Sequence, residues 1–200
     1  MGLHLTDAFA LLAISLVLCA GLLTLLSAWR GPWVTLIAVF GFALLWMSIA
    51  AMQIPVVAYV RGITSDLSIA LVALAVWRIG HLALGWRAID KREQMAVMAA
   101  LTVAALFLYP LALGWGDWDA YRVGWGSWGM LLMLLLLCSF CWLKDLRVLP
   151  VIVALALLAW CFGLMESTNL WDYLLDPWLS MYATGFVFIK CVQLAFARFR

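Results

Sequence analysis

Apolar residues fill seven long stretches of the chain, and all but two of the charged residues lie in the short gaps between them. A helix needs about 20 mostly apolar residues to cross the hydrocarbon core of a bilayer. The pattern therefore predicts an all-α fold, a polytopic transmembrane helical bundle of about seven spans. The expected spans cover residues 8–28, 33–54, 67–86, 95–114, 127–143, 148–165 and 178–197.

Basic residues gather in every second gap. One set of gaps holds eight basic and three acidic residues, and the other set holds two basic and seven acidic residues. Cytoplasmic loops of membrane proteins carry the excess of Lys and Arg, so the chain is expected to have its N-terminus outside and its C-terminus in the cytoplasm. Ten of the thirteen tryptophans fall at span ends or in gaps, as is typical of residues that prefer the headgroup layer.

Composition agrees with a membrane protein, because 68% of the residues are hydrophobic and 11% are charged. A soluble domain is about 45–50% apolar and about a quarter charged. No gap is long enough to fold alone, so residues 1–200 are expected to form a single integral membrane domain. The short loops favour a multi-pass protein of the bacterial inner membrane. No basic tract resembles a nucleic-acid-binding surface, so nucleic acid is not an expected partner.

Cysteine and histidine do not point to a cofactor. Cys138 and Cys141 have the CxxC spacing, but they lie toward the cytoplasmic end of the fifth span, where disulfides are disfavoured. His4 and His81 are expected at opposite faces, so they cannot ligate one haem together. No Cys, His and carboxylate cluster has metal-ligand spacing. We therefore expect no cofactor, no metal and no recognisable catalytic residue.

Two basic residues lie inside expected spans, Arg78 in the third and Lys190 in the seventh. Charged residues in the hydrocarbon are costly and are usually functional. Counted at about 1.5 Å per residue, both lie at a similar depth on the cytoplasmic side, and His81 follows Arg78 by one helical turn. No Asp or Glu occurs in any expected span. Arg78, His81 and Lys190 are therefore a candidate anion-binding site.

Three arrangements would satisfy these buried cations. The side chains could extend to the phosphates of the inner leaflet. They could line a pocket for an anionic solute or a lipid phosphate. They could also pair with a carboxylate, either from another subunit or from the cytoplasmic gaps, which contain Asp90, Glu93 and Asp145.

The outer gaps hold a second candidate site. The sequence of residues 166–178 predicts a short helix that ends at Pro177. Asp172, Tyr173 and Asp176 would lie on one polar face of this helix, and its leucines and a tryptophan would face the membrane. An interfacial amphipathic helix has the same pattern without any catalytic reason. The candidate outer surface for a ligand or partner comprises Asp117, Asp119, Arg122, Asp172, Tyr173 and Asp176.

Three functions fit these features. The chain could be a non-catalytic accessory or structural subunit of a membrane complex, with lipids, other subunits or copies of itself as partners. It could be a small transporter or lipid-handling protein that binds an anionic solute or headgroup. It could also be a membrane-embedded enzyme acting on a lipid-linked substrate. Transporters often break their spans at the midplane, whereas the prolines here lie at span ends, which favours the accessory subunit.

Overall fold

The computed structural model describes residues 4–27, 33–49 and 54–197 of the chain. Within these ranges the regular structure is helical, apart from one antiparallel pair of two-residue strands, β1 (Ser48–Ile49) and β2 (Ile54–Pro55). Apolar helices occupy the seven predicted places: α1 (Leu5–Leu26), α2 (Trp33–Leu45), α4 (Ile69–Leu84), α5 (Lys91–Ala112), α6 (Trp128–Leu143), α7 (Val148–Cys161) and α9 (Pro177–Ala197). Three short elements connect them: α3 (Val56–Thr64), the 3-10 helix η1 (Tyr121–Gly124) and α8 (Leu170–Leu174).

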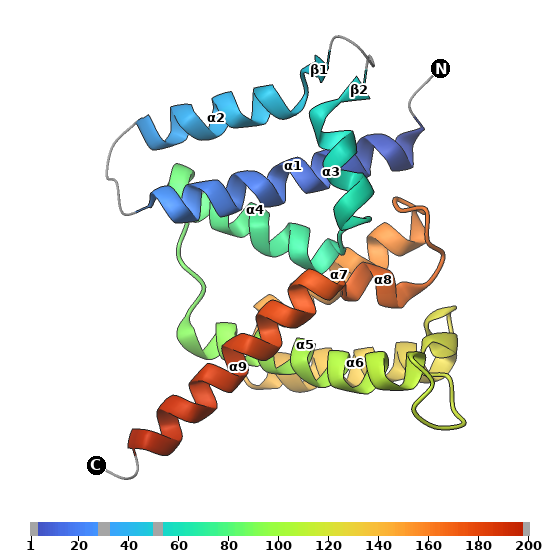
Figure 1. The fold of residues 1–200 in the computed structure, drawn as a ribbon. Helices are drawn as coiled ribbons and strands as arrows, with labels where there is room; N and C mark the ends of the chain where they lie inside the picture. The colour runs from blue at the N-terminus through green and yellow to red at the C-terminus, as the bar shows by residue number, and fades with distance from the viewer. Residues whose placement is uncertain (1–3, 28–32, 50–53, 198–200) are drawn as a thin grey trace.

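The long helices lie in two groups, as Figure 1 shows. Helix α1 packs against α2 and α4, and α5 packs against α9, which crosses the molecule obliquely. Helix α7 packs on both α4 and α6 and so joins the two groups. We call the end that holds the start of α1, α3, η1 and α8 the outer end. The opposite end, with the 85–90 connection and the 144–147 turn, is the inner end.

In the described part of the chain, α1, α5 and α9 are long and apolar enough to cross a membrane, which indicates a membrane protein. Helices α2, α4, α6 and α7 are also apolar but have only 13 to 16 residues. At 1.5 Å per residue they are about 20 to 24 Å long, against a hydrocarbon core of about 30 Å.

The second predicted span, 33–54, is wrong as one continuous helix. Helix α2 ends at Leu45, and a turn at Trp46 and Met47 leads into β1. The amides of Trp46 and Met47 bond to carbonyls three residues back, which tightens and ends the helix. Pro55, in β2, lacks a backbone N–H and disfavours helical geometry in the residue before it.

The short helix α8 also differs from its prediction. Leu170, Trp171 and Leu174 were expected to face the membrane, yet they are 0%, 3% and 7% exposed and pack in the core. The indole of Trp171 enters the core because its Nε1 donates to the carbonyl of Ala120 at 3.1 Å. With that polar atom satisfied, burial of the ring carries no penalty for an unpaired donor.

Candidate functional site

Arg61 binds three carboxylates at the outer end. Its Nη1 lies 2.7 Å from Asp7 Oδ1, its Nε lies 2.7 Å from Asp66 Oδ1, and its Nη2 lies 2.8 Å from Glu166 Oε1. These bonds join α1, α3 and the connections before α4 and α8. Hydrogen bonding to Asp66, and then to Asp7 and Glu166, raises the pKa of Arg61 above its ordinary value. The charge pattern did not predict this cluster, although Arg61 is one of only two basic residues in the acidic gaps.

Asp172 is the centre of a second polar cluster. Its Oδ2 accepts hydrogen bonds from Tyr121 Oη at 2.7 Å and from the hydroxyl of Ser167. Burial, and then the hydrogen bond to Asp172, raises the pKa of Tyr121 to about 12. Asn169 Nδ2 donates to the carbonyl of Tyr121 at 2.9 Å. The cluster therefore attaches η1 to the segment that precedes α8.

Tyr173 and Asp176 are buried rather than on the surface. Tyr173 is 1% exposed, and its hydroxyl donates to the carbonyl of Ser167 at 3.0 Å. Asp176 is 3% exposed, and its Oδ2 accepts from the backbone amide of Ser68 at 3.1 Å. The polar atoms of both residues are thus occupied by other parts of this chain.

The remaining outer-surface candidates lie in the loop after α5 and in η1. Asp119 Oδ1 accepts from the amide of Tyr121 at 2.9 Å, which orients the start of η1. Asp117 and Arg122 are exposed in the same region. The structure therefore places all six candidates at the outer end, but three of their four carboxylates serve as acceptors within the fold.

At the inner end, Arg78 and His81 line a cavity of about 720 Å³ between α1, α4, α5 and α9. Arg78 Nε donates to Thr24 Oγ1 at 3.0 Å. His81 Nδ1 lies 2.7 Å from the carbonyl of Trp86. A carbonyl can only accept, so Nδ1 carries the proton and Nε2 stays available. Thr24 and Gln94 also line this cavity, which we call the inner cleft; its other walls are mainly apolar.

Lys190 is not among the residues that line the inner cleft. Its Nζ donates to Gln193 Oε1 at 3.1 Å and lies 5.9 Å from the centre of the Phe186 ring. In the described ranges no carboxylate forms an ion pair with Arg78 or Lys190.

The carboxylates at the inner end that could have paired with Arg78 or Lys190 have other partners. Asp90 caps α5 by accepting from the amide of Arg92 at 3.2 Å. Glu93 caps the start of α7, because its two oxygens accept from the amides of Arg147 and Val148 at 2.8 and 3.1 Å. Asp145 Oδ1 lies 3.6 Å from Arg147 Nη2. Two of the three acids therefore satisfy helix ends.

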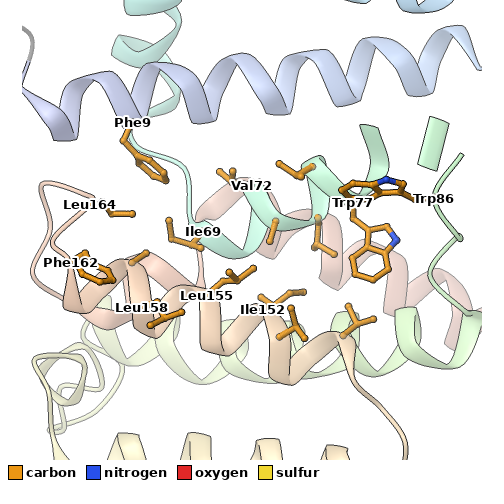
Figure 2. Close-up of a pocket in the computed structure, with 16 residues that line it drawn as sticks. Phe9, Ile69, Val72, Trp77, Trp86, Ile152, Leu155, Leu158, Phe162 and Leu164 are labelled. Carbon is orange, nitrogen blue, oxygen red and sulfur yellow. The ribbon is translucent and has the colours of Figure 1, made fainter. Parts of the chain in front are cut away.

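A separate apolar groove of about 460 Å³ runs between α4 and α7. Figure 2 shows Phe9, Phe162 and Leu164 at one end of this groove and Trp77 and Trp86 at the other. The ring of Trp86 lies where a Cβ on residue 80 would stand, so the glycine there allows it to fold over α4. The described residues that line the groove are all uncharged, so it has the chemistry of a lipid chain contact.

The comparisons with known proteins identify no relative: no family model, no curated protein and no solved structure matches this chain significantly.

Proposed function

We propose that this protein is a small multi-pass membrane protein that binds an anionic amphiphile in the inner cleft. The observation that carries the proposal is the asymmetric lining of the cleft. Arg78, His81, Thr24 and Gln94 gather toward its inner end, and apolar side chains of α1, α4, α5 and α9 form the remaining walls. A phosphate headgroup with an attached lipid chain matches both parts.

Arg78 supplies the charge for such a ligand. Among the described residues its guanidinium is engaged at Nε alone, by Thr24, which leaves the two terminal nitrogens to a phosphate. Paired N–H donors of guanidinium match two phosphate oxygens. His81 adds a donor at Nε2 when the ring is protonated. Lipid tails gain little from moving between one apolar medium and another, so the headgroup contacts select the ligand.

Native mass spectrometry in mild detergent tests this proposal. The purified protein is offered phosphatidic acid, phosphatidylglycerol and phosphatidylcholine, and the wild type is expected to retain the anionic lipids. Arg78→Gln should weaken that retention about tenfold or more, as loss of a charged hydrogen-bonding partner does. Arg122→Gln is the matched control, because it removes the same charge from an exposed position at the outer end. Equal retention by all three proteins would contradict the proposal.

We further propose the membrane topology that the charge pattern predicts. All seven apolar helices cross the bacterial inner membrane, with the outer end facing the periplasm and the inner end facing the cytoplasm. The four shorter helices are accommodated by local thinning of the bilayer. Reporter fusions at residue 200 and in the 114–126 loop test this arrangement. An active periplasmic reporter at residue 200 would contradict both the orientation and the odd number of spans.

A second candidate function is the accessory subunit of a membrane complex. Two helices favour it, because few of their side chains are fully buried within the chain. Among the described residues, α2 buries only Ala38, and α9 buries only Leu179, Ser180 and Ala183. Helices that contribute so little to the core of their own chain are available to partner helices in the bilayer.

A further inference from the structure

We propose that the face of α9 around Lys190 docks a transmembrane helix of a different protein, and that this helix carries an Asp or Glu at the depth of Lys190. The inference rests on the second candidate function, the accessory subunit. It does not depend on the ligand of the inner cleft.

Helix α9 leaves the core only in its second half. Its fully buried residues end at Ala183, but Phe186 and Val187 still pack against the core, and residues 191–197 are all exposed. Figure 1 shows α9 running obliquely away from α1 and α4 toward the inner end. Phe188, Ile189 and Leu194 are 68%, 56% and 64% exposed. The last two turns of this membrane-spanning helix are therefore open to lateral contact.

Lys190 is half-buried and lies where these open turns begin. It is seven residues before the end of α9, which is about 10 Å at 1.5 Å per residue. Its ammonium is held between Gln193 Oε1 and the ring of Phe186, which lies one turn back toward the middle of the helix. The ammonium is therefore held against the neighbouring turns of α9. A charge kept at this depth needs an anion.

Gln193 adds a second donor for the partner's carboxylate. Its Oε1 accepts from Lys190, which leaves the Nε2 amide hydrogens available as donors. One carboxylate placed beside α9 could then accept from both side chains, one turn apart. An uncharged Asn or Gln on the partner could share the hydrogen bonds but would not neutralise the ammonium.

A second copy of this chain does not supply the anion. All ten acidic residues lie outside the seven expected spans, so no copy offers a carboxylate at this depth. Two copies with the same orientation in the membrane, joined symmetrically through this face, would also bring two Lys190 charges together. The complementary occupant is a helix from another protein.

The test uses a synthetic transmembrane peptide of leucine and alanine with one Glu at the depth of Lys190, and the same peptide with Gln. Each carries a dansyl group, and association with the full-length protein in phosphatidylcholine vesicles is read from energy transfer from the native tryptophans. The Glu peptide should bind the wild type about tenfold more tightly than the Gln peptide. Lys190→Arg should keep this preference, and Lys190→Gln should remove it.

Leu135→Gln is the control variant, because it places the same amide on a 62% exposed position of α6. It should leave the preference unchanged. The proposal is overturned if the Glu peptide shows no preference, or if Lys190→Gln retains it. Displacement of the peptide by phosphatidylglycerol would also overturn it, since a lipid phosphate would then be the anion. The accessory function fails separately, if native spectra of the protein extracted from its own membrane hold no second protein.

Discussion

The carboxylate of Asp176 binds Ser68, which lies 108 positions earlier in the chain, and so joins the first turns of α9 and α4. Oδ2 accepts from the amide of Ser68 at 3.1 Å and from its hydroxyl at 2.5 Å. Oδ1 accepts from the amide of Leu179 at 2.9 Å. Ser68 in turn caps α4 by accepting from the amide of Leu71. One buried anion thus satisfies donors at the positive ends of two helices.

Replacing Asp176 with Asn should lower the free energy of unfolding by about 2 kcal/mol, because one of the charged hydrogen bonds is lost and an amide N–H then faces another donor. The midpoint of thermal unfolding in detergent measures the effect. Asp117→Asn is the control, since Asp117 is exposed, and it should change stability by less than about 0.5 kcal/mol. Equal midpoints for Asp176→Asn and the wild type would show that the two helix ends do not need this anion.

Arg61→Gln should destabilise the outer end by about 1 to 2 kcal/mol. The change leaves Asp7, Asp66 and Glu166 close together without their shared cation. The cluster is partly exposed, so the loss should shrink as the salt concentration rises. Thermal unfolding at low and high salt measures this, with Arg122→Gln as the matched loss of charge. A loss that does not respond to salt would contradict an electrostatic cause.

Gly124→Ala should lower the free energy of unfolding by about 1 to 3 kcal/mol, as overpacking of a filled core does. A Cβ at this position would collide with Asn169 Oδ1 and would lie 2.6 Å from the Trp171 ring. Gly129→Ala is the matched control, because nothing lies within 4 Å of its Cβ position at the start of α6. It should be neutral or stabilising by up to about 1 kcal/mol. Chemical unfolding of both variants measures these changes. The prediction fails if the two variants have the same free energy of unfolding.

Tyr121 should make stability fall at alkaline pH. Its pKa is about 12 in the fold, against an ordinary value of 10.0. Because the folded state favours the protonated phenol, its contribution to stability is fully present below pH 10. This contribution is lost as the pH rises from about 10 to 12. Phenolate absorbance should show one tyrosine titrating near pH 12 that Tyr121→Phe removes. Asp172→Asn should move that titration to lower pH, because the carboxylate that opposes phenolate formation is gone; an unmoved titration would contradict the assignment.

Several features depend on contacts between distant segments. Asp176 and Tyr173 fall on the polar face expected for residues 166–178, but the fold buries both, where they bond to Ser68 and Ser167. Arg61 binds a carboxylate 105 positions away along the chain, and no local spacing indicates such a contact. Arg78 and His81 share a helical face in the sequence, whereas the cleft beside them exists only because α5 and α9 stand opposite α4.

The sequence by itself determined the all-helical character and the places of the seven apolar helices. These follow from runs of apolar residues, a signal that acts along a single segment. Tertiary structure alone decided the burial of α8 and which carboxylates accept hydrogen bonds from distant segments. The physical reason is that burial and pairing depend on which distant groups can satisfy a polar atom, and a periodic pattern along one helix contains no record of them.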